Sequence, residues 1–209
     1  MDQFTIILLY FTSFFTLMNP IGTMPVFLTM TSDLTKSQRR NTAFKAVLTA
    51  GFALVLFAFA GKYLFDFFGI SVSGLKVVGG ILFFFIGFDM LNARISRMKM
   101  TVEEAEKYVD DISITPLGIP MIAGPGAITN AIVLMGDAQS FTQKSLVIVS
   151  IVLVLIVVLL TFVGASGITK FIGENGNKIM MKLMGLIVMV IAVEFFFAGL
   201  KPYVQALLQ

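Results

Sequence analysis

The chain of 209 residues contains no cysteine, no histidine and no tryptophan. Without cysteine it forms no disulfide and has no thiol nucleophile. Without cysteine or histidine it lacks the usual ligands for zinc, haem iron and iron–sulfur clusters. A Ser-His or Cys-His catalytic pair is excluded for the same reason. We therefore predict a protein that is not an enzyme and that holds no metal and no cofactor.

Charged residues are also scarce. They make up 13% of the chain, hydrophobic residues make up 57%, and the mean hydropathy is +0.95. Soluble domains are nearer to about half apolar and about one quarter charged. The net charge is only +3, and no basic segment is interleaved with aromatic residues, so nucleic-acid binding is not expected. The composition is typical of a membrane protein.

Six apolar runs have the length that crosses a lipid bilayer as an α-helix. They are residues 4–29, 42–68, 72–93, 112–135, 145–167 and 179–200. The runs predict an all-α, polytopic membrane protein with six transmembrane helices in a single domain surrounded by the lipid bilayer. Residues 94–111 carry many charges and are predicted to form a cytoplasmic linker, either a solvated helix or a mobile segment.

Lysine and arginine are distributed unevenly among the connecting segments. If the N-terminus lies outside, the cytoplasmic segments contain eleven of the fifteen basic residues and the outer segments contain four. Basic residues in short loops favour the cytoplasmic side. Both termini are therefore predicted to lie on the outer face of the membrane.

The two halves of the chain align without a gap. Placing Pro20 on Pro125, an offset of 105 residues, puts the second span on the fifth and the third on the sixth, and Asp89 falls on Glu194. We predict an internal duplication, with repeat one at about 4–93 and repeat two at about 112–200. Each repeat has three spans, so the second is inverted relative to the first. Inverted repeats are common in secondary transporters, which bind substrate near the midplane where discontinuous helices meet.

Two motifs place proline and glycine inside the first and fourth spans: NPIGTMP at residues 19–25 and PMIAGPGAITN at residues 120–130. Proline removes a helical hydrogen-bond donor, and backbone groups without a partner are costly in lipid. We therefore predict that both spans are broken there and that the breaks face one buried polar cavity.

The broken backbone predicts the chemistry of a ligand. The N–H groups of residues 21–23 and 126–128 are expected to be free and to favour a carboxylate, while the carbonyl groups before each break favour an ammonium group. A small zwitterionic substrate fits both. The predicted substrate site consists of Asn19, Pro20, Gly22, Thr23, Gly124, Pro125, Gly126, Ala127, Thr129 and Asn130.

Asp89 and Glu194 are the acidic residues within the third and sixth spans. Charged residues in spans are rare and usually functional. Two interpretations stay open: each is an interfacial carboxylate paired with a nearby lysine or arginine, or one of them carries a coupling proton or closes a gate. The phenylalanines at 83–85 and 195–197 are predicted to pack or to face lipid.

Oligomeric state is not determined by the sequence. Small residues would allow close helix contacts within one chain or in a homo-oligomer. They are Gly79, Gly80, Gly164 and Gly167.

The segments NPIGTMPVF at 19–27 and PLGIPMIAGPGAITNAIVL at 116–134 resemble the two signatures of the MarC family of bacterial and archaeal inner-membrane proteins. The resemblance covers essentially the whole chain, with a mild departure at Gly118, where a residue such as alanine is expected. It implies location in the plasma (inner) membrane of a prokaryote and transport of small neutral amino acids, as an exporter or a proton-coupled carrier. The family motifs imply a substrate-site backbone at Asn19, Pro20, Gly22, Pro25, Gly124, Pro125, Gly126 and Ala127.

The function expected from the residues and the resemblance is secondary transport of small neutral amino acids such as alanine, glycine or serine. No GxxxxGK[ST] signature for ATP binding is present. Two alternatives stay open, a channel or pore for small polar solutes and a membrane partner protein that transports nothing. Saturation and counterflow distinguish a carrier from a pore.

Overall fold

The computed structural model of the chain describes residues 2–92, 102–165 and 168–208, and all regular structure in these residues is helical. The elements are α1 (Gln3–Met18), α2 (Pro20–Met30), α3 (Lys36–Phe68), α4 (Val72–Leu91), α5 (Val102–Ile112), the irregular segment η1 (Ser113–Ile122), α6 (Pro125–Asp137), α7 (Phe141–Ala165) and α8 (Ile168–Leu207). The prediction of an all-α fold is confirmed.

The described part of the chain contains five helical stretches that are long and apolar enough to cross a membrane. They are Gln3–Met30, Lys36–Phe68, Val72–Leu91, Phe141–Ala165 and Gly185–Leu207. A sixth crossing results if the stretches Lys107–Ile122 and Pro125–Asp137, which are bent by 61°, are taken together. These crossings agree with the polytopic architecture predicted from the apolar runs.

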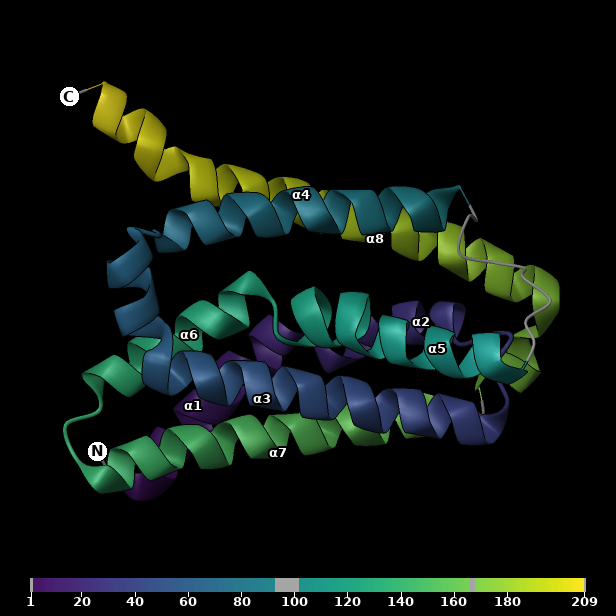
Figure 1. Ribbon diagram of the computed structural model, residues 1–209, viewed down its shortest axis with the longest axis horizontal. Helices are drawn as coiled ribbons and strands as arrows, with labels where there is room; N and C mark the ends of the chain where they lie inside the picture. Colours follow the sequence, from purple (N-terminus) through teal and green to yellow (C-terminus); the bar gives the residue numbers. More distant parts are fainter. Residues whose placement is uncertain (1, 93–101, 166–167, 209) are drawn as a thin grey trace.

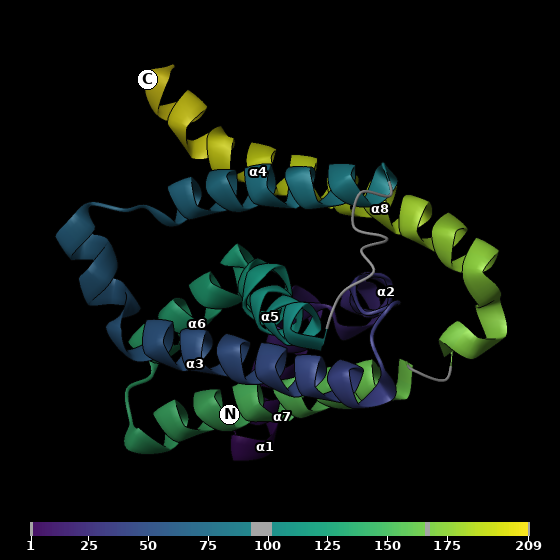
Figure 2. The ribbon, with the colours of Figure 1, turned by 45° about the vertical axis from the view of Figure 1, so that its right-hand side comes forward.

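The bundle has three layers. Helices α4 and α8 lie side by side on one side, α3 and α7 lie on the other with α1 against α7, and α2, η1 and α6 lie between them (Figures 1 and 2). Both chain termini lie at one end of the bundle, which we call the termini end (Figure 1). The connection between α2 and α3 lies at the opposite end, the loop end. The middle layer is therefore enclosed by the outer helices, whereas α1, the first half of the first interrupted span, is mostly exposed or half-buried.

Helices α4 and α8 approach each other closely because glycine lies at their contact. A Cβ at residue 80 would lie 2.7 Å from the Ala192 carbonyl oxygen, and one at residue 87 would lie 2.7 Å from the Gly185 carbonyl oxygen. Small residues allow such backbone contacts between membrane helices. Gly80 thus allows a close helix contact within one chain.

The remaining glycines of the predicted close contacts differ from Gly80 and from each other. Gly79 packs against the ring of Pro125, Gly164 has nothing within 4 Å of its Cβ position, and Gly167 lies outside the described residues. Gly79 therefore also serves contacts within the chain.

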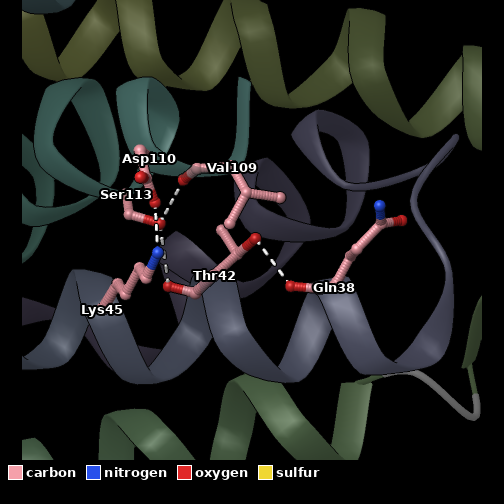
Figure 3. Close-up of polar contacts among 6 residues, drawn as sticks. All are labelled: Gln38, Thr42, Lys45, Val109, Asp110 and Ser113. Carbon is pink, nitrogen blue, oxygen red and sulfur yellow. Dashed lines mark hydrogen bonds and ion pairs between the residues drawn. The ribbon is translucent and has the colours of Figure 1, made fainter. Parts of the chain in front are cut away.

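Helix α5 packs against α3, as Figure 3 shows. Lys45 forms an ion pair with Asp110, and the hydroxyl of Ser113 donates to the carbonyl oxygens of Val109 and Thr42. Val109 is only 2% exposed. The second half of the predicted linker is therefore a helix held against the bundle, and residues 94–101 of that linker lie outside the described residues.

Helices α3, α7 and α8 begin earlier than the apolar runs, α3 and α8 by the most. Helix α3 begins at Lys36, where Thr35 accepts a hydrogen bond from the Gln38 N–H and the Gln38 side chain accepts one from the Thr35 N–H. This capping box fixes the start of the helix. Helix α8 begins at Ile168, and no proline interrupts the sequence from there to Pro202. Hydropathy marks only the part of each helix that suits lipid.

Candidate functional site

One residue, Asn19, both ends α1 and begins α2. Its backbone is left-handed, with φ 45° and ψ 66°, and its N–H donates to the Phe15 carbonyl oxygen over 2.9 Å. Its side-chain oxygen accepts a hydrogen bond of 3.1 Å from the Gly22 N–H, and Pro20 is the first residue of α2. Asparagine tolerates left-handed angles better than most residues and is a strong N-cap, and proline suits the first helical position. The sequence N-P-x-G therefore interrupts the span and restarts it at once.

The first break offers fewer free N–H groups than the sequence predicts. The Gly22 N–H donates to the Asn19 side chain, and the Thr23 N–H donates to the Asn19 carbonyl oxygen over 3.0 Å. The prediction of free groups is wrong for these two residues because Asn19 caps the helix itself. In the first turn the N–H of Ile21 is left, so this helix start has little capacity to bind an anion.

The second break is built differently. The N-cap of α6 is Gly124, with φ −74° and ψ 167°, and no side chain caps this helix. The Ile128 N–H donates to the Gly124 carbonyl oxygen over 2.9 Å. The prediction of a free N–H group is therefore wrong for Ile128 as well. The N–H groups of Gly126 and Ala127 have no acceptor within α6, as at any helix start.

Gly124 has no room for a capping side chain. A Cβ at residue 124 would lie 2.9 Å from the Pro120 carbonyl oxygen. Pro120 belongs to η1, where Thr115 and Ile119 are extended (φ −132°), as is usual before proline. Helix α6 therefore keeps an uncapped N-terminus with its partial positive charge.

Both breaks open onto one cavity of about 550 Å³, which we call the central cavity. It is lined by residues 16–19 and 21–25 of the first break, by Met121, Gly124 and Gly126 of the second, and by Phe83, Ile187, Val188, Ile191 and Phe195 of α4 and α8. No charged side chain lines it.

The central cavity contains half of the predicted site residues. Those that line it are Asn19, Gly22, Thr23, Gly124 and Gly126. The prolines Pro20 and Pro125 and the side chain of Ala127 are buried but do not line it. They position the backbone at each break.

Thr129 and Asn130 line a separate second chamber of about 480 Å³. Its other residues are Lys76, Val133, Glu194 and Ala198, together with Leu17, Gly126 and Phe195, which it shares with the central cavity. The Ser13 hydroxyl donates to the Asn130 side-chain oxygen over 2.9 Å. Among the described residues, the Thr129 hydroxyl and the Asn130 side-chain nitrogen are buried without a hydrogen-bond partner.

The two acidic residues of the third and sixth spans have different surroundings. Glu194 is exposed and lines the second chamber, whereas Asp89 lines neither the second chamber nor the central cavity. Among the side chains that the structure describes, neither forms an ion pair with lysine or arginine. Of the two, Glu194 is placed where it can contact a solute.

Two functional candidates escape sequence reasoning. Phe83 and Phe195 lie with ring centroids 6.0 Å apart and at 72° to each other, and both line the central cavity. The two rings pack against each other, as predicted, and they also line the cavity, which the sequence does not predict. A signal exists in the sequence: Phe83 is three or four residues from Gly80 and Gly87, which identifies the packed face of α4.

The described residues contain no group of three or more histidine, cysteine, aspartate or glutamate side chains that could hold a metal ion. Polar contacts in the two chambers come from backbone groups, hydroxyls, one amide side chain in each chamber, and the charged pair Lys76 and Glu194.

Comparison with known proteins gives matches along nearly the whole chain. Residues 4–204 match the family described as MarC family integral membrane protein. A UPF0056 membrane protein of Methanocaldococcus jannaschii is 38% identical over 198 residues, which is 93% of this chain and 95% of the relative. A UPF0056 membrane protein of Buchnera aphidicola is 34% identical over 208 residues, 100% of this chain and 98% of the relative. The UPF0056 membrane protein YvbG of Bacillus subtilis is 36% identical over 202 residues, 95% of this chain and 96% of the relative. No solved structure matches the chain.

Proposed function

The chain belongs to the MarC family of integral membrane proteins, and we propose that it is a secondary transporter of small neutral amino acids such as alanine, glycine or serine. The observation that carries the proposal is the uncapped N-terminus of α6, at Gly126, beside a cavity that both interrupted spans form. A volume of about 550 Å³ is within the usual range for a small-molecule site.

The lining of the central cavity fits both ends of a zwitterion. A carboxylate at Gly126 would receive the free N–H groups of α6 and the favourable end of its dipole. The carbonyl oxygens of Thr16 and Ile21 lack a helical donor because the residues four positions later are Pro20 and Pro25. Both residues line the cavity and would accept hydrogen bonds from an ammonium group.

The absence of charged side chains from the central cavity favours a substrate without net charge. An ion in this cavity would have no side chain of opposite charge beside it. The rings of Phe83 and Phe195 form an apolar wall that suits a short side chain. A sugar phosphate or a dianion would find no cation there.

Contacts between α4 and α8 support the inverted repeat on which an alternating mechanism would rest. The offset of 105 residues moves Gly80 to Gly185 and Gly87 to Ala192. It thereby converts the close contact of Gly80 with Ala192 into that of Gly185 with Gly87. Equivalent halves can exchange roles and give two states of similar energy that open on opposite sides. We place the protein in a prokaryotic plasma membrane with both termini outside, following the distribution of basic residues.

Counterflow in proteoliposomes tests the proposal. Labelled alanine should enter faster when unlabelled alanine is inside, and uptake should saturate. Unlabelled alanine should compete, whereas alaninamide and propionate, each lacking one end of the zwitterion, should not. Linear uptake without counterflow would indicate a pore, and no uptake of any amino acid would favour a partner protein that transports nothing.

A matched pair of variants connects the result to the site. Gly126→Val places a side chain in the first turn of α6, beside its free N–H groups. Space is limited there, because a Cβ at residue 126 would already lie 3.0 Å from the Leu17 side chain. Gly136→Val changes a glycine of the same helix that has nothing within 4 Å. The proposal requires loss of counterflow in the first variant and retention in the second.

A further inference from the structure

The two chambers follow one another along the bundle. Helices α1, α4, α6 and α8 line both, and on α4, α6 and α8 a residue of the second chamber is nearer to the termini end than one of the central cavity. The pairs are Lys76 and Phe83 on α4, Glu194 and Val188 on α8, and Asn130 and Gly124 on α6. At about 1.5 Å per residue, each pair is separated by about 9–11 Å along its helix. The second chamber therefore lies between the central cavity and the termini end.

Three residues separate the chambers and line both: Leu17 of α1, Gly126 of α6 and Phe195 of α8. A Cβ at residue 126 would lie 3.0 Å from the Leu17 Cδ2 atom and 3.5 Å from the Phe195 Cζ atom. The side chains of Leu17 and Phe195, from two different helices, thus both lie next to the glycine. We call this pair of side chains the Leu17–Phe195 gate.

The second chamber differs from the central cavity in its charge. Its lining includes one cation, Lys76, and one anion, Glu194, which do not form an ion pair with each other in the described part of the chain. It also includes the polar residues Thr129 and Asn130. A zwitterion can meet Lys76 with its carboxylate and Glu194 with its ammonium group.

We infer that the second chamber is a separate binding site for a zwitterionic amino acid, on the route between the central cavity and the termini end, and that the Leu17–Phe195 gate closes this route in the present conformation. The identity of the ligand rests on the proposed function. The gate rests only on the packing of its residues.

Thiol labelling tests the gate directly, because the natural chain contains no cysteine. Ala198→Cys reports on the second chamber and Val188→Cys on the central cavity. A membrane-impermeant methanethiosulfonate added on the termini side should modify Ala198→Cys readily. It should modify Val188→Cys about ten- to a thousandfold more slowly, since minor open states are commonly populated at about 0.1–10%.

Gate variants complete the test. Leu17→Ala and Phe195→Ala should accelerate modification of Val188→Cys several-fold and leave Ala198→Cys unchanged. Matched controls on the same helices are Leu9→Ala and Phe197→Ala, whose side chains are 52% and 61% exposed and line neither chamber. Equal rates at the two cysteines, or acceleration by the controls as well, would overturn the gate.

Protection by ligand tests the binding site. Alanine should slow modification of Ala198→Cys, and Glu194→Gln and Lys76→Gln should abolish this protection, whereas Lys62→Gln, outside both chambers, should not. Protection of Val188→Cys in the Leu17→Ala background without protection of Ala198→Cys would overturn the second site while the proposed function stands. If no neutral amino acid protected either cysteine, the ligand assignment of both the central cavity and the second chamber would be overturned. The labelling rates alone would then decide whether the gate exists.

Discussion

The side chain of Asn19 occupies the space beside Gly22: a Cβ at residue 22 would lie 2.2 Å from the Asn19 Nδ2 atom. Asn19 caps α2 only because residue 22 has no side chain. The asparagine and the glycine of the first motif thus form one local unit, and Pro20 between them starts the new helix. The motif has a folding role that is independent of any ligand.

The first prediction follows from this contact. Gly22→Ala should displace the Asn19 amide and cost about 0.5–2 kcal/mol of unfolding free energy, the usual value of an N-cap. Gly164→Ala is the matched control, because nothing lies within 4 Å of a Cβ at that position. The measurement is unfolding in mixed micelles titrated with a denaturing detergent. Equal stability of the two variants would contradict the capping role.

The spans of this protein are predictable from sequence because the bilayer sets the length of an apolar run. The helix ends are less predictable. Hydropathy indicates which residues suit the lipid core, but a helix can continue beyond them. Helix α8, for example, extends from Ile168 to Leu207, well beyond its apolar run at both ends. The role of Asn19 could have been predicted, because asparagine before proline is a good N-cap signal.

The division of the site into two chambers is not predictable from sequence. Thr129 and Asn130 lie three to six residues from Gly124 and Gly126, so the sequence groups them together. Leu17 and Phe195 separate them from most of the central cavity, and these residues come from helices that are distant in sequence. Only packing between α1, α6 and α8 reveals the separation.

The second prediction contrasts two glycines of the second motif. Gly124→Ala should cost about 1–3 kcal/mol, because its Cβ would lie 2.9 Å from the Pro120 carbonyl oxygen and backbone must move. Gly126→Ala should cost less than about 1 kcal/mol, since its nearest neighbour is the flexible end of Leu17. Unfolding free energies in mixed micelles check the order. The reverse order would show that the cramped N-cap of α6 is not real.

The third prediction concerns the contact between α4 and the start of α6. A Cβ at residue 79 would lie 2.0 Å from the Pro125 Cγ atom, so Gly79→Ala should displace the second break and reduce both stability and transport. Pro125→Ala removes the obstructing ring, and the double variant should recover stability with a coupling energy of about 0.5–3 kcal/mol. Gly80→Ala provides the control cycle with Pro125→Ala, since its neighbours are Ala192 and Phe196. Additive effects in both cycles would count against direct packing of Pro125 on Gly79.

The fourth prediction separates Glu194 from Asp89, which the sequence treats as equivalent. Glu194 lines the second chamber and Asp89 lines neither chamber, so Glu194→Gln should raise the KM for alanine while Asp89→Asn leaves it unchanged. Loss of one exposed charge-assisted contact, at about 1 kcal/mol, corresponds to about fivefold in KM. Initial uptake rates over a range of alanine concentrations, at two external pH values, give both KM and its pH dependence.

The same experiment decides whether either carboxylate has a part in coupling. If Glu194 carries a proton during transport, Glu194→Gln should abolish the difference in uptake between the two pH values as well as raise KM. A pH difference that persists in both variants would exclude both residues as the proton carrier and would leave Glu194 with the binding role alone. A raised KM in Asp89→Asn without one in Glu194→Gln would instead contradict the placement of a binding site at the termini end, because Asp89 is near the end of α4 at the loop end.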